Sequence, residues 1–189
     1  MSGEIKNRRS EILRHAHQLL HERGFNAFSH RDLAKLVGVK SSSIHYYFPT
    51  KQDVGLALII EYREELADFF STLETLPVLE RLQQFCELFV TSVQTGGWCL
   101  AGMLASDFDS LEAALRGELQ NFFDLAENWL AEQTLLLYPG LDREEALQRG
   151  KCGIAMLEGA SLLARAQEDL RFLQKVAQTL PLLLSIKQA

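Results

Sequence analysis

The chain has 189 residues, of which 47% are apolar and 23% charged, a composition typical of a folded globular protein with one or two domains. The longest apolar runs, such as Leu56 to Ile60, are far shorter than the roughly 18 residues of a membrane span. No apolar block of signal-peptide length follows the charged N-terminus, so we expect a cytoplasmic protein without a membrane segment. The formal charge of −6 argues at first against a nucleic acid as partner.

The charge is distributed unevenly along the chain, which reverses that first inference. Residues 1–51 hold nine Lys and Arg against four Asp and Glu, a balance of +5, whereas residues 52–189 hold ten against twenty-one, a balance of −11. All five histidines lie in the first 45 residues. A basic segment attached to an acidic body suits a polyanion-binding head, with chance clustering as the alternative.

The three cysteines, Cys86, Cys99 and Cys152, are widely scattered and show no C-x-x-C spacing. This pattern argues against a disulfide framework and against a zinc ribbon. His17 and His21 lie one helical turn apart and could hold a metal ion, but no third ligand is evident nearby, and solvated histidines are the alternative. We therefore expect no metal and no cofactor.

The first two predicted helices lie in the basic segment. Apolar residues at three- and four-residue steps from Ile5 to Leu20 predict a helix that ends near Arg23, where Gly24 stops it. The run Ser29-His30-Arg31-Asp32 fits a capping box at the start of a second helix, and Gly38 ends that helix.

A third and a fourth helix follow directly. Ser41 or Ser42 can cap a very short helix that runs through Phe48, because Pro49 prevents its continuation. The run Thr50-Lys51-Gln52-Asp53 is a second capping box, and it opens a helix that we expect to extend to about Leu73.

The remainder of the chain also shows helical periodicity and no sustained alternation with a period of two residues. The sequence therefore predicts an all-α fold of about nine helices. We expect a helix-turn-helix DNA-binding domain over residues 1–51 and a helical ligand-binding and dimerisation domain over residues 52–189. The further helices are expected at Pro77 to Gln94, Leu100 to Asp107, Leu111 to Leu136, Arg143 to Gln167 and Asp169 to Lys187.

The second and third helices have the spacing of a helix-turn-helix unit. Ala34 is small where the helices cross, Gly38 and Val39 form the tight turn, and Ile44 is the branched residue of the second helix. With Ile44 and Phe48 turned inward, a step of about 100° per residue directs the polar side chains to solvent. Those side chains belong to Ser42, Ser43, His45 and Tyr46.

This polar face can bind DNA, since hydroxyl, imidazole and phenol groups exchange hydrogen bonds with phosphates and base edges in the major groove. Lys51 lies in the first turn of the fourth helix, where a cation opposes the helix dipole unless an anion is bound there. A DNA phosphate would be such an anion, and Lys40 can serve in the same way. The alternative is a polar helix on the surface of an ordinary bundle.

The stretch FSHRDLAKLVGVKSSSIHYYFPTKQDV resembles the DNA-binding signature of the tetracycline-repressor (TetR) family of bacterial regulators, with close similarity over about residues 10–60. The resemblance implies a homodimer that binds a pseudo-palindromic operator as a repressor and is released by a small ligand. His45 departs from the family pattern, in which a tyrosine often stands. The DNA-contacting positions implied by the resemblance are Ser29, His30, Arg31, Lys40, Ser41, Ser42, Ser43, His45, Tyr46, Tyr47 and Lys51.

The last two predicted helices carry more apolar surface than one small body needs, which indicates a partner. In the resembled family these helices pair with their symmetry mates as a four-helix bundle, and a homodimer is expected here. The alternative is that the same residues fill the core of the monomer. They are Ile154, Leu157, Ala160, Ser161, Ala164, Leu170, Leu173, Val176, Leu180, Leu183 and Leu184.

Aromatic and thioether side chains of the acidic body could line a cavity for an effector, although packed core is the alternative for each. Cys99, just after Gly96-Gly97, could be a reactive thiol or an inert buried one. The helix from Lys51 to Leu73 spans head and body and is the expected lever between them. The candidates for the cavity are Phe85, Phe89, Trp98, Met103, Phe108, Phe122, Phe123, Trp129 and Met156.

Two other functional classes remain. An enzyme is not expected, because the chain lacks a Gly-rich phosphate loop, H-E-x-x-H and G-x-S-x-G. A helical protein-interaction module without DNA binding would account for the apolar stripes but not for the basic head or its exposed polar face.

Overall fold

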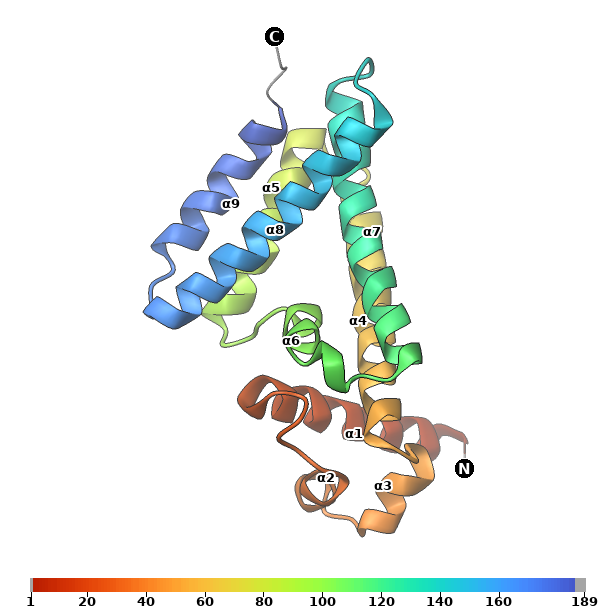
Figure 1. Ribbon diagram of the computed structural model, residues 1–189. Helices are drawn as coiled ribbons and strands as arrows, with labels where there is room; N and C mark the ends of the chain where they lie inside the picture. The colour runs from red at the N-terminus through yellow and green to blue at the C-terminus, as the bar shows by residue number, and fades with distance from the viewer. Residues whose placement is uncertain (1, 186–189) are drawn as a thin grey trace. The chain divides into compact units, whose positions relative to one another are not determined.

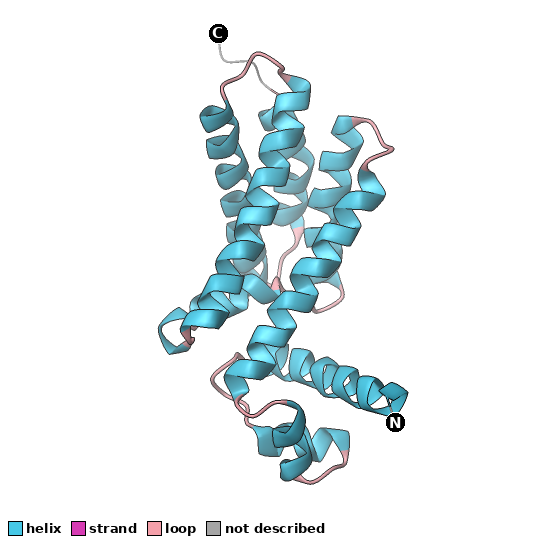
Figure 2. Ribbon diagram, turned by 90° about the vertical axis from the view of Figure 1, so that its right-hand side faces the viewer, coloured by secondary structure: helices cyan, strands magenta, loops and turns pink. Residues whose placement is uncertain are grey.

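A computed structural model describes residues 2–185 of the chain, and within that span the fold is all-α, with helices joined by short loops and no strand (Figure 2). The predicted fold class is confirmed. None of the described helices is both long and apolar enough to cross a membrane. The helices are α1 Ser2–Arg23, α2 His30–Val37, α3 Ser41–Tyr47, α4 Lys51–Leu73, α5 Val78–Gln94, α6 Leu100–Ser106, the 3₁₀ helix η1 Phe108–Ser110, α7 Ala113–Leu137, α8 Arg143–Gln167 and α9 Arg171–Leu184.

The chain forms two compact units, whose division differs from the boundary expected at residue 51. The first unit holds the residues up to Glu64 together with Leu100–Phe122, and the second holds Glu65–Cys99 and the residues from Phe123 onward. Helices α4 and α7 therefore each contribute to both units. The assignment of residues 1–51 to DNA binding concerns function and stays a prediction.

In the first unit, α1 packs against α2 and α6, and α2 packs against α3. Ile12 of α1, Leu33 of α2 and Ile44 of α3 are fully buried, so the three amphipathic helices share one small core. Gly55 of α4 is part of this packing, because a Cβ there would lie 2.8 Å from the Phe25 ring.

The segment after α6 is fastened to the loop between α1 and α2. Asp107 accepts a hydrogen bond from the backbone N–H of Phe25 at 3.1 Å and from Nδ2 of Asn26 at 2.8 Å. Gln52 of α4 donates to the carbonyl of Ser110 at 2.8 Å and accepts from the N–H of Glu112 at 3.1 Å. These four bonds tie the residues around η1 to the α1–α2 loop and to the start of α4, although the sequence had assigned residues 100–122 to the body.

In the second unit, α9 lies beside α8 and α5 (Figure 1). Leu157 of α8 and Leu173 and Leu180 of α9 are buried between them. Gly150 permits α8 to approach α7 closely, since a Cβ at this position would collide with the backbone carbonyl oxygen of Glu127. The small residue thus sets the distance between these two helices.

The start of α3 and the bounds of α9 differ from the sequence predictions. Lys40 is the N-cap residue of α3 and makes no side-chain cap, so the expected capping by Ser41 or Ser42 is wrong. The extended backbone that an N-cap requires falls at Lys40, and both serines already lie inside the helix. Helix α9 begins at Arg171 instead of Asp169 and runs to Leu184; the expected end at Lys187 lies outside the described residues.

Candidate nucleic-acid interface

The orientation predicted for the third helix is confirmed. Ile44 is fully buried and Phe48 is 3% exposed, so the side of α3 that carries them faces the core of the first unit. On the other side Ser42 and His45 are exposed, and Tyr46 is 75% exposed. Ser41, Ser43 and Tyr47 are half-buried along the edges of this face. Helix α3 therefore presents hydroxyl, imidazole and phenol groups to solvent.

The turn that holds α3 across α2 depends on Gly38. This residue has φ 71° and ψ 34°, the left-handed conformation that a side chain would make costly. The backbone N–H of Val39 donates to the carbonyl of Ala34 at 3.0 Å and closes the turn. The glycine in the tight turn of the helix-turn-helix pattern is explained by this geometry.

Both predicted capping boxes are confirmed. Asp32 accepts from the backbone N–H of Ser29 at 2.9 Å, and Asp53 accepts from the N–H of Thr50 at 2.7 Å. The hydrogen bonds from Ser29 hold the pKa of the Asp32 carboxyl below its ordinary value. Ser29 is thus engaged in starting α2, whereas the neighbouring Arg31 and the N-cap Lys40 are exposed.

Two histidines join the start of α2 to α3. The rings of His30 and His45 have centroids 4.3 Å apart, and Nδ1 of His45 lies 3.1 Å from the carbonyl oxygen of Pro49. Nε2 of His30 is buried without a hydrogen-bond partner. Burial lowers the pKa of His30, and the nearby His45 lowers it further. The ring of His30 is therefore half-buried beside α3, and His45 carries the exposed imidazole.

Lys51 has intramolecular partners that the sequence did not reveal. Its Nζ lies 3.4 Å from the carbonyl oxygens of both Asn26 and Phe28, and 4.9 Å from the centre of the Phe25 ring. Partial burial lowers the pKa of this ammonium group. Its charge is thus directed to the loop between α1 and α2, and the phosphate contact expected for Lys51 stays a prediction.

Several of the predicted effector contacts form a packed aromatic cluster in the second unit. Phe70 and Trp129 stack with ring centroids 4.2 Å apart and an interplanar angle of 3°. Phe85 is 1% exposed and lies edge-on to Phe89 at 5.5 Å. Phe122 is also buried, but in the first unit, where it stacks on Tyr62 at 5.0 Å. Packed core, the alternative to a ligand contact, describes the surroundings of Phe85 and Phe122.

The remaining effector candidates lie in varied surroundings. The guanidinium of Arg165 lies 4.9 Å from the Trp98 ring centre, and the adjacent Cys99 contacts Glu158 through its side chain. Burial raises the pKa of the Glu158 carboxyl, while that contact opposes the rise. Met156 is 36% exposed on α8, and Phe108 is 47% exposed beneath the guanidinium of Arg116. Met103 and Phe123 are half-buried.

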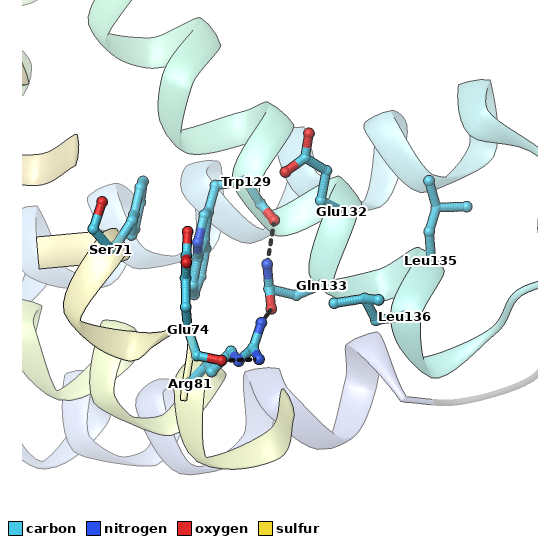
Figure 3. A pocket seen from close by; sticks show the side chains of 9 residues that line it. Ser71, Glu74, Arg81, Trp129, Glu132, Gln133, Leu135 and Leu136 are labelled. Atoms are coloured by element: carbon cyan, nitrogen blue, oxygen red, sulfur yellow. Dashed lines mark hydrogen bonds between the residues drawn. The ribbon is translucent and has the colours of Figure 1, made fainter. Parts of the chain in front are cut away.

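A cavity of about 640 Å³ opens beside Trp129 in the second unit (Figure 3). Arg81 donates to the carbonyls of Glu74 and Leu76 and, at 3.4 Å, to Oε1 of Gln133, so its guanidinium fixes the end of α4 against α5 and α7. Trp129 is the predicted effector contact that lines this space. The other lining residues are Phe70, Ser71, Glu74, Arg81, Glu132, Gln133, Leu135 and Leu136.

Sequence reasoning missed Asp107 and Gln52, which join the residues after α6 to the α1–α2 loop and to α4. The partners of Asp107 lie 81 and 82 residues away in the sequence. A lone aspartate in a loop carries no periodic signal, so the pairing could be found only in three dimensions.

Family models match two segments of the chain. The model for bacterial regulatory proteins of the tetR family matches residues 12–58, which include α2, α3 and the start of α4. The model for the C-terminal domain of LmrA/YxaF-like transcriptional regulators matches residues 78–179. The second match alone covers more than half of the chain.

Solved structures and a curated relative agree with these matches. A TetR transcriptional regulator from Legionella pneumophila is 35% identical, with a TM-score of 0.83 over 92% of this chain and 95% of that one. A TetR-family regulator from Agrobacterium tumefaciens is 25% identical, with a TM-score of 0.85 over 93% and 96%. An HTH-type transcriptional regulator of Lactococcus lactis is 22% identical over 90% of this chain and 89% of its own length.

A helix-turn-helix unit with an exposed polar recognition face, joined to a helical body, defines a DNA-binding transcriptional regulator. The matched family models and the similarity over nearly the full length specify the family of this regulator. The chain belongs to the TetR family of bacterial transcriptional regulators.

Proposed function

We propose that this regulator is a homodimeric repressor that binds a pseudo-palindromic operator and leaves it when a small ligand binds to the helical body. The observation that carries the proposal is the polar face of α3, with Tyr46 75% exposed above the buried Ile44. Dimers of helix-turn-helix proteins bind two half-sites about 34 Å apart, so an operator with two related halves is expected.

The proposed DNA contacts come from both helices of the motif and from the starts of α3 and α4. Ser42, His45 and Tyr46 are assigned to base edges because they project furthest from the core. Phosphate contacts position the motif and come from the flanking residues. These are Ser29, His30, Arg31, Lys40, Ser41, Ser43, Tyr47 and Lys51.

The proposed dimer interface uses exposed faces of α8 and α9. Leu157, Leu173 and Leu180, which the sequence offered as interface residues, are almost fully buried in one protomer, so packing within the protomer already uses them. The opposite side of α8 carries a second stripe at three- and four-residue steps, and α9 adds more exposed apolar side chains. This exposed set is Cys152, Ala155, Met156, Gly159, Leu162 and Leu163 on α8, and Phe172, Leu182 and Leu183 on α9.

Such a surface is unusual for a monomer, since large contiguous apolar patches mark interaction sites. Leu162 is 67% exposed and Leu182 61%. Apart from its own turns of helix backbone and its chain neighbours, a Cβ added at Gly159 would meet no atom of the protomer within 4 Å, which leaves room for the backbone of a partner helix. A second copy of the chain is the partner that fits a family of dimers.

The effector is assigned to the cavity beside Trp129, which is lined by only this one of the aromatic and thioether residues that the sequence offered as effector contacts. A volume of about 640 Å³ suits a drug-sized molecule, and the lining combines an aromatic stack with carboxylate, amide and guanidinium groups. The bonds of Asp107 and Gln52 connect the residues after α6 to the loop that precedes α2 and to α4, so a shift of these residues can reach the motif in addition to a movement of α4 itself. Residues 1–51 are proposed to bind DNA and residues 52–189 to bind the effector and the partner subunit, within the cytoplasm.

The proposal is tested by selecting bound fragments from random duplexes with the purified full chain and sequencing them. Enrichment of a sequence with two related half-sites is expected. Tyr46→Ala should then weaken binding to that duplex in a mobility-shift titration, whereas the control Tyr138→Ala, in the second unit, should not. Failure to enrich any sequence, or full affinity in Tyr46→Ala, would contradict the proposal.

A further inference from the structure

A hollow of about 470 Å³ lies between α1 and α3 at the edge of the recognition face. Arg8 of α1 lines one part of it, and Ser42, Ser43, Tyr46 and Tyr47 of α3 line another. All of these residues belong to the first compact unit, so the hollow lies entirely within that unit.

The chemistry of this hollow suits an anion. Its described lining offers one guanidinium and four hydroxyl groups as hydrogen-bond donors, and none of those lining residues carries a carboxylate. The apolar part of the lining comes from Ile12, which is fully buried, and from Val39. A guanidinium presents its N–H groups in a planar fork that matches two phosphate oxygens, and hydroxyl groups can complete the coordination.

The guanidinium of Arg8 forms an exposed ion pair that a phosphate can replace. Its Nη1 lies 2.6 Å from Oε2 of Glu11, one helical turn along α1, and the two side chains are 44% and 34% exposed. An ion pair this exposed contributes little to stability. The guanidinium can therefore exchange the carboxylate for a phosphate at small cost.

The two neighbouring arginines of α1 have other partners. Arg9 pairs with Glu61 of α4 at 3.0 Å, and its guanidinium lies 5.3 Å from the centre of the Phe48 ring. Arg14 lies 3.1 Å from the ring of His15. Lys51, the cation expected beside α3, is directed to the α1–α2 loop. Arg8 is thus the cation that lines the hollow together with the hydroxyl groups of α3.

We propose that Arg8, together with the hydroxyl groups of Ser43 and Tyr47, binds a phosphate of the DNA backbone next to the bases that α3 reads. The inference rests on the proposed DNA binding by α3 and adds to it a residue outside the helix-turn-helix motif. Bound in this way, the phosphate fixes how deeply and at what angle α3 enters the major groove. A backbone contact carries no base identity, so its effect is the same for every sequence.

The salt dependence of binding measures the number of phosphates neutralised. The slope of log affinity against log salt concentration changes by about 0.9 for each phosphate contact on B-form DNA. A dimer with one Arg8 contact per subunit should therefore lose about 1.8 from its slope when Arg8 is neutralised.

The test measures the affinity of the full chain for the selected duplex and for a random duplex by fluorescence anisotropy over a series of KCl concentrations. Arg8→Gln should weaken binding to both duplexes and make the slope less steep by about 1.8. Arg14→Gln removes the same charge from the same helix and should leave the slope unchanged. Glu11→Gln frees Arg8 from its carboxylate and should strengthen binding.

Arg8→Lys and Tyr47→Phe separate charge from geometry and guard against a folding defect in Arg8→Gln. Each should keep the unmodified slope, because the charge is kept, and should bind more weakly because hydrogen bonds to the phosphate are lost. An unchanged slope in Arg8→Gln, or an equal loss in Arg14→Gln, would overturn the phosphate site while DNA binding stands. Absence of duplex binding by the unmodified chain would instead overturn the proposed function, and the site with it.

Discussion

Nδ2 of Asn26 donates to Oδ1 of Asp107 at 2.8 Å, and so joins the loop before α2 to the segment after α6 across 81 residues of sequence. The other oxygen of Asp107 accepts from the partly buried backbone N–H of Phe25. One carboxylate therefore satisfies two donors of a loop that would otherwise depend on water.

Asp107→Ala should lower the free energy of unfolding by about 1–3 kcal/mol, because it leaves the N–H of Phe25 without its acceptor. Urea unfolding followed by circular dichroism measures the change. Asp109→Ala, two residues away on an exposed position of η1, is the control and should stay within about 0.5 kcal/mol of the parent. Equal stability of the two variants would contradict the role of Asp107.

Two glycines in helices of this chain should respond in opposite directions to alanine. Gly150→Ala should destabilise by about 1–3 kcal/mol, since the new Cβ collides with the backbone carbonyl of Glu127, which cannot rotate away as a side chain can. Gly117→Ala, on an open and exposed part of α7, should stabilise by about 0.5–1 kcal/mol through the lower helix propensity of glycine. Thermal unfolding of both variants provides the comparison.

Leu162→Glu should convert the proposed dimer into a monomer of 21.4 kDa, because it places a charge on the most exposed leucine of the exposed stripe on α8. Leu136→Glu, on α7, is the control, because that leucine is also highly exposed, at 56%, but lies outside the stripe. Sedimentation velocity at micromolar protein separates the two species. A Leu162→Glu protein that sediments like the parent would exclude this face as the interface.

The stability of the protein should fall as the pH is lowered through about 6.5, the ordinary pKa of histidine. Burial lowers the pKa of His17 and of His30, so each binds a proton more readily in the unfolded chain than in the folded one. Protons therefore favour unfolding below the unfolded-state pKa, and the penalty disappears at higher pH. His17→Gln combined with His30→Gln should flatten the dependence of the unfolding midpoint on pH between 5 and 7. A slope as steep as that of the parent would show that other groups cause it.

The carboxyl group of Asp169 should titrate at about 2, because hydrogen bonds from the side chain and the backbone N–H of Arg171 stabilise its charged form. The depressed pKa means that its contribution to stability is complete above 3.8 and is lost as the pH falls through 2. Arg171→Gln should raise the NMR titration midpoint towards 3.8, and Arg165→Gln, in the last turn of α8, should leave it unchanged. A midpoint near 3.8 in the parent protein would contradict the bond.

The helix-turn-helix unit could be predicted from the sequence because its determinants are local. Gly38 occupies the position where the backbone is left-handed, which favours glycine. Ile44 and Phe48 lie on one side of a short helix, so helix geometry alone determines which side chains are exposed. The two capping boxes were equally readable, since donor and acceptor lie three residues apart.

What could not be predicted depends on long side chains and distant partners. The direction of Lys51 follows from carbonyls exposed by the loop between α1 and α2, and the hollow beside Arg8 exists only where α1 crosses α3. On α8 only the stripe that contains Leu157, which is buried, was recognised from the sequence, and not the exposed stripe that contains Leu162, because both repeat at three- and four-residue steps and periodicity does not tell which one faces the core.

The capping boxes also affect the electrostatic interaction between the helix-turn-helix unit and DNA phosphates. Asp32 and Asp53 stand on either side of α3 in the chain, where bare carboxylates would repel phosphates. In each of these aspartates, Oδ2 accepts hydrogen bonds from both the backbone N–H and the hydroxyl of the capping residue. These hydrogen bonds partly neutralise the carboxylate at the start of each helix. The motif can therefore carry an acidic residue in the first turn of α2 and of α4 with less repulsion of the DNA phosphates.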